Sequence, residues 1–534
     1  MSASGYHEPS RPSSRSRSGL RHRSRGRAKR KEREQGSAWH WFKHDLREAV
    51  GRYSKQTSAA HKRFAALLIL VGAGLRAWLL NEPVTIDEAS MYVSFGTQSF
   101  TAILTDYSLP INHVLHTMLV KVSTSLFGLS TFSLRIPAFL AGVLAMPLFY
   151  MLTRSLFNRY IALMTLAMVA GCPPLIELSA LALGYSISWC AFLAALLVAR
   201  HLVRENNPWS AAIMGLCLAL GMWSVTTTVF TAVMAFLWVL FTLMGKYQRS
   251  LNERLTMLGL AVVVFMLGTT LLYMPVVLEH GVDGLFIHQS EGENTWATFS
   301  AGYAERVIEF WMFAADPSYD WLLLLGFGGL MHATYVSGKF RAIVFSLLLG
   351  AVPLAIALQE DGPAYLWSYM IFFFCMGSAI ALFYLLKLIQ EKLVKGMGKR
   401  SRTAWASVAL LALYASGLGV AKARMGHQAE TRPGAALIIA SMKADDRLCF
   451  DARWERIVSF ELLAQGMPME RLHQVISYKG EMPVGSTLWL ALGKRGGPSP
   501  PEAISRCGLQ AGNYDQPVLY KEWPRLEIFA ARKR

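Results

Sequence analysis

The chain has 534 residues, of which 53% are hydrophobic and only 16% are charged. A soluble protein of this length would carry roughly a quarter charged residues, and the apolar residues gather in runs near the ~20 needed to cross a bilayer. Composition therefore excludes an ordinary soluble protein. The net charge of +18 is concentrated in the first ~60 residues and in short loops, as expected of cytoplasmic segments rather than of a nucleic-acid-binding surface.

The N-terminal residues 1–38 are rich in Arg and Ser and have almost no apolar side chains. They predict a disordered basic cytoplasmic tail, which either sets topology or attracts anionic lipid, with RNA binding as a less favoured alternative. Residues 39–63 predict an interfacial amphipathic helix. The first apolar run starts at Phe64, so we expect no cleavable signal peptide.

The topology depends on residues 111–127, which are too polar for a good membrane span. If they are instead a juxtamembrane helix on the outer surface, the later loops that carry Lys and Arg all lie on the inner side of the membrane. The sequence then predicts an all-α polytopic membrane protein whose N-terminus is cytoplasmic and whose C-terminus is outside. Its 11 or so spans, at the usual span length, are 64–80, 134–152, 160–176, 184–200, 209–223, 226–244, 255–277, 320–337, 342–358, 367–388 and 403–422.

The tail, residues 423–534, differs from the apolar segments before it. Residues 435–440, 447–450 and 487–492 predict short strands, and residues 455–463 predict a helix. We expect a small extracytoplasmic α/β domain, attached to the transmembrane domain 64–422. In an oxidising compartment Cys449 and Cys507 would form a disulfide, and two free buried thiols are the alternative.

Two adjacent acids, Asp87 and Glu88, follow the first span and lie in the predicted external segment 81–133. Carboxylates at a membrane boundary are costly unless they are solvated or functional. Partial desolvation would raise the pKa of Asp87, which suits a general base that takes a proton from a hydroxyl. Glu88 would orient the acceptor or hold a cation. In the alternative, one or both acids cap a helix.

Two histidines, His113 and His116, lie three residues apart and would share a helix face. They lack a third ligand with suitable spacing, so the sequence predicts no metal site, and a contact with phosphate is the other interpretation. Lys121 and Arg135 are the nearby cations, and Arg76 lies within the first span near its outer end. Arg76 is explained if its long side chain snorkels to the membrane surface. The functional interpretation is that Arg76 contacts a lipid phosphate.

Four ordered stretches carry a family resemblance: D-E-A-S (87–90), N-H-V-L-H-T-M-L-V (112–120), F-G-L-S-T-F-S-L-R-I-P (127–137) and P-P-L-I-E-L-S-A-L-A-L-G-Y-S (173–186). Together they resemble the polyprenyl-phosphate-sugar-dependent glycosyltransferases of the GT-C fold. This superfamily includes glycosyltransferase family 39, the protein mannosyltransferases and the aminoarabinose transferases of lipid A. The resemblance covers residues 64–200 well and the rest by architecture.

The resemblance implies that Asp87 is the catalytic base and that Tyr185, in the last stretch, contacts the donor. The donor would be a polyprenyl-phosphate-linked monosaccharide used on the periplasmic or lumenal face of a membrane, here a bacterial inner membrane. An acceptor hydroxyl on an envelope lipid, glycan or protein would attack the anomeric carbon in one inverting displacement. No cofactor follows from the motifs, and a divalent cation is left open.

The sequence departs from the family pattern at Leu183 and Ser368, where many members carry arginine. Arginines there would clamp a phosphate. Arg76, Lys121, Arg135 and Arg306 are the cations expected to replace them. The alternatives are a catalytically inactive relative that binds lipid-linked sugar, or a lipid or sugar transporter, although the chain shows no internal repeat of the kind that transporters have.

Overall fold

The computed structural model describes residues 37–109, 111–244, 250–282, 296–315, 319–336, 338–359, 362–392, 398–476, 482–494 and 496–534. The predicted basic tail lies outside these ranges except for its last two residues. Residues 245–249, in one of the loops predicted to lie on the inner side, and residues 283–295 also lie outside them.

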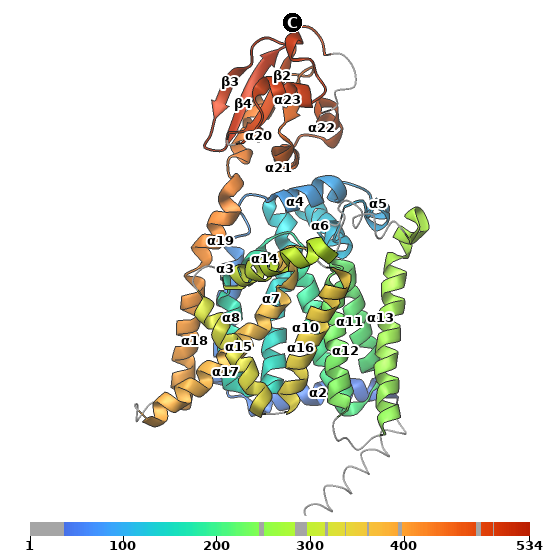
Figure 1. Ribbon diagram of the computed structural model, residues 1–534, viewed down its shortest axis with the longest axis vertical. Coiled ribbons are helices and arrows are strands. Elements are labelled where there is room, and N and C mark those ends of the chain that lie inside the picture. The colour runs from blue at the N-terminus through green and yellow to red at the C-terminus, as the bar shows by residue number, and fades with distance from the viewer. Residues whose placement is uncertain are drawn as a thin grey trace, which may run out of the picture.

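A bundle of long helices makes up most of the molecule (Figure 1). Helices overlap all eleven predicted spans in the described part of the chain. They are α3 (Ala59–Ala77), α7 (Thr131–Leu156), α8 (Arg159–Gly171) with α9 (Pro173–Ala180), α10 (Tyr185–Glu205), α11 (Pro208–Ser224), α12 (Thr228–Leu243), α13 (Leu251–His280), α15 (Asp320–Val336), α16 (Gly338–Leu358), α17 (Tyr369–Lys392) and α18 (Lys399–Ala415) with α19 (Leu418–Met425).

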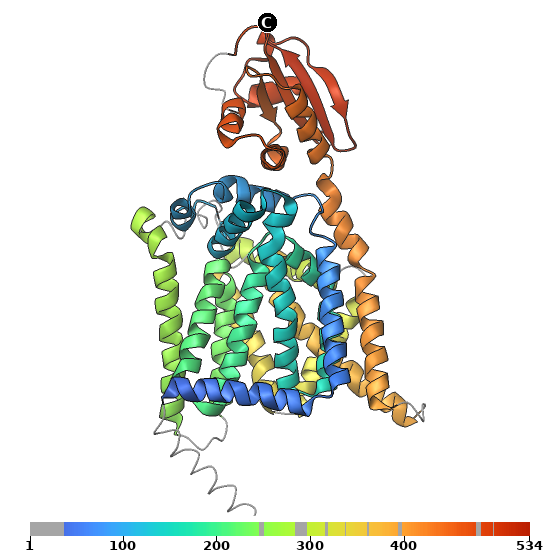
Figure 2. The same cartoon turned by 180° about the vertical axis from the view of Figure 1, so that it is seen from behind.

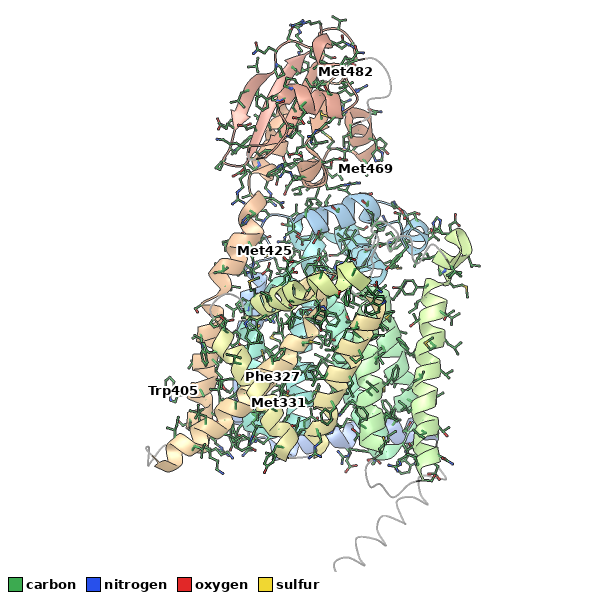
Figure 3. The ribbon with its side chains drawn as sticks, viewed as in Figure 1. Phe327, Met331, Trp405, Met425, Met469 and Met482 are labelled. Atoms are coloured by element: carbon green, nitrogen blue, oxygen red, sulfur yellow. A yellow bond between two sulfur atoms is a disulfide. The ribbon has the colours of Figure 1, made fainter. Side chains whose placement is uncertain are left out.

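The bundle has the surface of a multi-pass membrane protein. In the described residues, six helices are long and apolar enough to cross a bilayer, or seven if the bent pair α8 and α9 is one span. Large apolar side chains point outward, such as Leu271 on α13, which is 68% exposed, and Trp405, which Figure 3 shows directed away from the bundle. The other predicted spans fall on shorter or more polar helices, so the total of eleven stays a prediction.

Helix α2 (Ala38–Gln56) lies across one end of the bundle, and the C-terminal domain stands at the other end (Figure 2). The aromatic face of α2 packs on the bundle, where Trp39 of α2 meets Trp209 of α11 with ring centroids 5.0 Å apart. The helix ends at Gln56, and α3 begins three residues later. The predicted interfacial segment 39–63 is therefore two helices in the structure, because residues 59–63 already belong to the first long helix.

Short helices cap the end of the bundle that faces the C-terminal domain (Figure 1). They are α4 (Ile86–Met91), the π-helix η1 (Tyr92–Gly96), α5 (Phe100–Thr105) and α6 (Val114–Phe127), which we call the platform. With 14 residues, α6 is about 21 Å long, too short to cross the ~30 Å hydrocarbon core. The connection between α13 and α15 contains a further helix, α14 (Trp296–Ala315), which packs on the 3₁₀ helix η4 (Ala364–Trp367).

The C-terminal domain contains a four-stranded mixed sheet with strand order β1-β2-β4-β3. β1 (Arg447–Phe450) and β2 (Thr487–Gly493) pair in parallel, while β4 (Leu526–Arg532) pairs antiparallel with β2 and with β3 (Val518–Glu522). Helices α20 (Thr431–Ser441), α21 (Ala452–Ala464), α22 (Met469–Ile476) and α23 (Pro500–Arg506) complete the domain. A disulfide joins Cys449 to Cys507.

The prediction of a strand at 435–440 was wrong, since these residues form part of α20. A short apolar run does not distinguish a strand from a buried helix. Alanine favours the helix, and Ala435 and Ile438, three residues apart, bury the same face. The predicted strands at 447–450 and 487–492 and the predicted helix at 455–463 correspond to β1, β2 and α21.

The C-terminal domain rests on the platform through α21. Ile457 and Phe460 share a buried cluster with Ala89 and Met91 of α4, and Phe460 meets the ring of Tyr92 edge-on at 5.7 Å. An ion pair between Lys422 of α19 and Glu82, 3.0 Å long, adds a second link to the same loop. Two regions of the chain thus hold the short segment that carries the two acids.

Candidate active site

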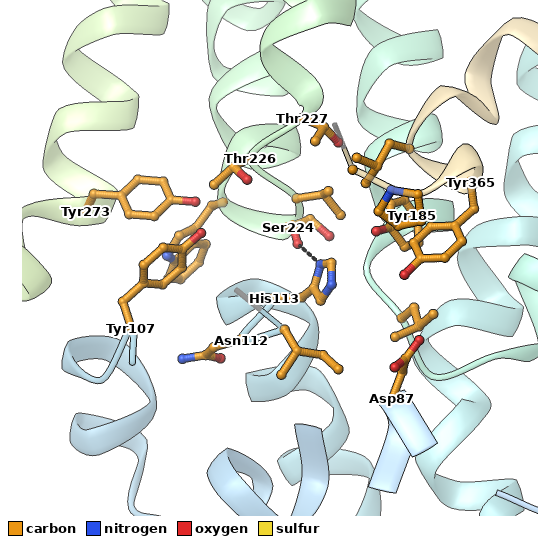
Figure 4. A pocket seen from close by; sticks show the side chains of 17 residues that line it. Asp87, Tyr107, Asn112, His113, Tyr185, Ser224, Thr226, Thr227, Tyr273 and Tyr365 are labelled. Carbon is orange, nitrogen blue, oxygen red and sulfur yellow. Dashed lines mark hydrogen bonds between the residues drawn. The ribbon is translucent and has the colours of Figure 1, made fainter. Parts of the chain in front are cut away.

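A cavity of about 490 Å³ lies where the platform meets the bundle (Figure 4). Its wall combines residues from the platform, the loop before α10, the α11–α12 connection, α13 and η4. The lining residues are Asp87, Tyr107, Ile111, Asn112, His113, Leu183, Tyr185, Trp223, Ser224, Val225, Thr226, Thr227, Tyr273, Gly362, Pro363, Tyr365 and Leu366. Phenol and alcohol hydroxyls make up half of the side-chain polar atoms on these residues.

Asp87 is the one acidic residue among the described residues that line the cavity. It occupies the first turn of α4, whose start is set by a capping box between Thr85 and Glu88. Burial, and then the negative charge of Glu88, raises the pKa of Asp87. A carboxylate with a raised pKa, open to a cavity, has the properties of a general base.

Glu88 points away from the cavity into a fully buried ion pair with Arg135. The pair is bidentate, with both N–O distances 2.7 Å and both side chains 0% exposed. The Ala182 backbone N–H also donates to Glu88, at 2.7 Å. Burial alone would raise the pKa of Glu88, but the charge and hydrogen bonds of Arg135 outweigh it and hold that pKa below its usual value.

Arg135 also donates to four main-chain carbonyls in the segment between α3 and α4, those of Leu79, Leu80, Glu82 and Pro83, at 2.8–3.3 Å. Its guanidinium is thereby committed to protein groups and is not among the residues that line the cavity. The Glu88–Arg135 pair fixes α4, and with it Asp87, against α7.

An aromatic row crosses the cavity beside Asp87. His113 and Tyr185 lie edge to face at 5.5 Å, and Tyr185 and Tyr365 do so at 5.2 Å. Figure 4 shows the hydroxyl of Tyr365 directed toward Asp87. Burial, and then the charges of Asp87 and Glu309, raise the pKa of Tyr365 to about 12, so the phenol stays protonated at neutral pH and can donate a hydrogen bond.

His113 is held by the main chain of α11, since its Nδ1 lies 2.9 Å from the Ser224 carbonyl oxygen. A carbonyl only accepts, so Nδ1 carries the proton. Burial lowers the pKa of His113 to about 4, and the imidazole is neutral at physiological pH. A Cβ at Gly184 would lie 2.5 Å from this carbonyl oxygen and 2.9 Å from Nδ1, so glycine is needed for this close approach.

His116 shares the buried side of α6 but does not line the cavity. Burial lowers its pKa to about 3, so it too is uncharged at neutral pH. The group of His and acidic side chains that the described residues bring within metal-binding range is His44, Asp45 and Glu48 on α2, at the opposite end of the bundle. Among described residues, the cavity itself has no such group.

The cations predicted to hold a phosphate do not line the cavity. Arg76 is buried between α3 and α8, where it donates to the carbonyls of Gly72, Val169 and Ala170. Lys121 lies over the ring of Phe100. Arg306 lies over Phe299 on its own helix α14. With Arg135 in its buried pair, no Lys or Arg of the described chain is part of the cavity wall.

Both positions where the family pattern has arginine are close to this site. Leu183 lines the cavity, and Ser368 follows η4 and accepts a hydrogen bond from the Trp189 indole at 3.1 Å. The structure thus brings together Asp87, His113 and Tyr185 of the predicted site residues.

Sequence reasoning missed Tyr107, Trp223, Tyr273 and Tyr365. They come from four separate parts of the chain, and no motif marks them.

The match to a known family covers residues 113–273, which agree with the model of the dolichyl-phosphate-mannose-protein mannosyltransferase family. This confirms the resemblance found in the motifs. The matched region begins at His113 and runs through Tyr273, so it includes much of the cavity wall. A search of the curated proteins finds no match.

Among solved structures, the chain is similar to ArnT from Cupriavidus metallidurans in its apo state, with a TM-score of 0.56 and 15% identity. The alignment covers 89% of this chain and 98% of that one. The same protein bound to undecaprenyl phosphate matches with a TM-score of 0.51, again at 15% identity and with the same coverage. At this identity the similarity shows a shared fold over nearly the full length of both chains.

Proposed function

Residues 113–273 match the model of the dolichyl-phosphate-mannose-protein mannosyltransferase family, and we propose that the chain transfers a monosaccharide from a polyprenyl-phosphate-linked donor. ArnT, which has the same fold, is seen with undecaprenyl phosphate bound, and this supports a donor of that class. The acceptor is a hydroxyl of an envelope lipid, glycan or protein on the side of the C-terminal domain. We propose that this side is the periplasm of a bacterial cell.

In the proposed reaction, Asp87 takes the proton of the acceptor hydroxyl. The freed oxygen attacks the anomeric carbon of the donor sugar, the bond from this carbon to the phosphate oxygen breaks, and the electron pair leaves with polyprenyl phosphate. One displacement inverts the anomeric configuration. The observation that carries this proposal is the position of Asp87, a carboxylate of raised pKa that opens on a cavity lined by hydroxyls.

The neighbours of Asp87 have separate parts in this scheme. We assign Tyr365, whose hydroxyl is directed toward the carboxylate (Figure 4), the role of orienting Asp87, and we assign His113 and Tyr185 contacts with substrate in the cavity. Glu88 and Arg135 act as positioning residues, because their buried pair sets the place of α4. The geometry gives no support for contact of Arg76, Lys121 or Arg306 with the donor phosphate.

The proposal is tested by mass spectrometry of envelope glycolipids and glycoproteins from cells that lack the gene and carry either the wild-type or a variant copy. We expect Asp87→Asn to abolish a sugar modification that the wild type restores. Asp106→Asn is the matched control, since Asp106 is an acid of the same platform that forms a turn with Ser108. Normal modification by an Asp87→Asn protein present at wild-type amounts would refute a catalytic role for Asp87.

One observation favours a second candidate, an inactive relative that binds lipid-linked sugar. No described residue of the cavity wall is a Lys or Arg, and arginine is absent at 183 and 368. This candidate predicts that the same spectra are identical with and without the gene, whereas the leading proposal predicts a missing mass of one sugar.

A further inference from the structure

The cavity has two unlike ends. Figure 4 shows Asp87 and Tyr365 on one side, and Tyr107 and Tyr273 on the opposite side, with Asn112 and His113 between them. Tyr107 and Tyr273 meet edge to face with ring centroids 6.0 Å apart, and the Tyr273 hydroxyl donates to the Met222 carbonyl at 2.8 Å. The two phenols form an aromatic wall that the catalytic scheme above does not use.

Two polar atoms near this wall lack partners among the described residues. They are Asn112 Oδ1 and Trp223 Nε1, both buried, on residues that line the cavity. The Asn112 side chain is 2% exposed, and its Nδ2 donates to the carbonyls of Ile103, at 3.1 Å, and Asp106, at 2.6 Å. These two bonds fix which way the amide points, and they leave its oxygen as an unfilled acceptor.

The two unpartnered atoms differ in kind, and this difference limits what can bind. An amide oxygen accepts and an indole N–H donates. A hydroxyl both donates and accepts, so it satisfies both, while a fully ionised phosphate group offers acceptors alone. Buried polar groups are normally hydrogen-bonded, so unfilled ones in a cavity indicate a polar partner.

The charge of the cavity also favours an uncharged ligand over an anion. Asp87 is negative when it acts as a base, His113 is neutral, and the described wall has no Lys or Arg. An anion placed among these groups would be desolvated without a compensating cation, which is costly.

We propose that Tyr107, Asn112, Trp223 and Tyr273 form a subsite for an uncharged hydroxyl-bearing group, a sugar ring, and that phosphate is excluded from it. We call it the neutral subsite. This inference rests on the proposed function, because the sugar would belong to either the donor or the acceptor of the transfer. Aromatic rings cover the apolar face of a sugar, while Asn112 and Trp223 meet its hydroxyls.

Fluorine NMR of the full-length protein in lipid nanodiscs, labelled with 5-fluorotryptophan, tests the proposal. Trp223→Phe assigns the Trp223 signal, and the signal of Trp41 on α2, assigned by Trp41→Phe, reports on a site at the far end of the bundle. Three probes of equal chain length are titrated below micelle formation: hexyl glucoside, hexyl phosphate, and glucosyl hexyl phosphate.

We expect hexyl glucoside to shift the Trp223 signal in a saturable manner, leaving Trp41 unmoved, and hexyl phosphate to leave Trp223 unmoved. If glucosyl hexyl phosphate saturates the Trp223 shift at lower concentration than hexyl glucoside, the sugar is that of the donor. If it saturates at higher concentration, the sugar is that of the acceptor. A shift by hexyl phosphate, or no shift by either glucoside, overturns the proposal.

A second measurement does not depend on the label. Trp223→Phe keeps an aromatic ring and removes the N–H donor, so hexyl glucoside should bind about fivefold more weakly in calorimetry, the value of one neutral hydrogen bond. Unchanged affinity would contradict the subsite. Neither measurement involves transfer, so an inactive Asp87→Asn protein that still binds hexyl glucoside would separate the neutral subsite from the catalytic proposal.

Discussion

The raised pKa of Asp87 gives the reaction a defined dependence on pH. A general base works in its deprotonated form, so the transfer rate falls as pH falls through the pKa of Asp87, by about tenfold per pH unit below it. Because burial and Glu88 raise this pKa, the loss should begin above the pH at which an ordinary Asp titrates. The rate–pH profile of membranes measures it, and a rate that increases from pH 7 to pH 5 would contradict the role of Asp87 as base.

The buried pair of Glu88 and Arg135 predicts a cost in stability. Glu88→Gln leaves the Arg135 charge buried without its counter-charge, which destabilises a protein by about 3–5 kcal/mol. Arg506→Met breaks the exposed pair with Glu502 and is expected to cost under about 1 kcal/mol. Thermal unfolding of the two purified variants compares them, and equal transition temperatures would show that the buried pair does not hold α4 in place.

Some of the individual site residues could be predicted from the sequence. Asp87 was found because an acid at a membrane boundary is costly. The structural part of Glu88 was also visible, since T-I-D-E at 85–88 has the spacing of a capping box. Its partner Arg135 is 47 residues away, and no local pattern joins the two. Long-range pairing is the step that one sequence does not reveal.

Among the elements, α21 has the most specific consequence for the site. Phe460 packs on α4, whereas Leu462, two residues further, is buried in the core of the C-terminal domain. Phe460→Ala should lower the transfer rate because it loosens the helix that carries Asp87. Leu462→Ala should instead destabilise the domain by about 2–5 kcal/mol.

Transfer assays and hydrogen exchange on the same two proteins measure the separate effects. We expect a lower rate with normal protection of β1 and β2 in Phe460→Ala, and weakened protection in Leu462→Ala. If Phe460→Ala transfers at the wild-type rate, docking of the domain does not position Asp87.

Helices were predicted better than strands. Apolar runs near membrane length identified the long helices of the bundle, and the distribution of Lys and Arg set 111–127 apart as a surface helix. The 20-residue helix α14 was not predicted. The strands β3 and β4 were not predicted, and 435–440 was assigned to the wrong class. Short apolar segments in a small domain acquire their conformation from packing, as Ala435 and Ile438 do.

For the whole molecule, the disulfide between Cys449 and Cys507 links residues 58 apart in the C-terminal domain. A cross-link over a loop of this length stabilises by roughly 4 kcal/mol in the chain-entropy model. Cys507→Ser should therefore lower the protection of the domain against hydrogen exchange, whereas Cys217→Ser, at a free cysteine of the bundle, should not. Equal protection of the domain in the two variants would contradict a stabilising role for the disulfide.

The cations predicted to bind phosphate are not part of the cavity wall, and their role stays a prediction. A lipid phosphate suggested a cationic site, and four cations near the outer ends of the helices were chosen for it. In the structure they lie in packing and ion-pair contacts instead, and the polar side chains of the cavity are hydroxyls, an amide, an imidazole, an indole and one acid. Which cations reach a cavity depends on how distant helices pack, and composition carries no information on that.

The rate of sugar transfer to endogenous acceptors, in membranes that contain Asp87→Asn or wild-type protein in equal amounts, tests the central claim most directly. We expect a loss of about 10²–10⁴-fold, the usual contribution of a general base, with Asp106→Asn retaining the wild-type rate. A rate within twofold of wild type for Asp87→Asn would contradict the assignment of Asp87 as the catalytic base.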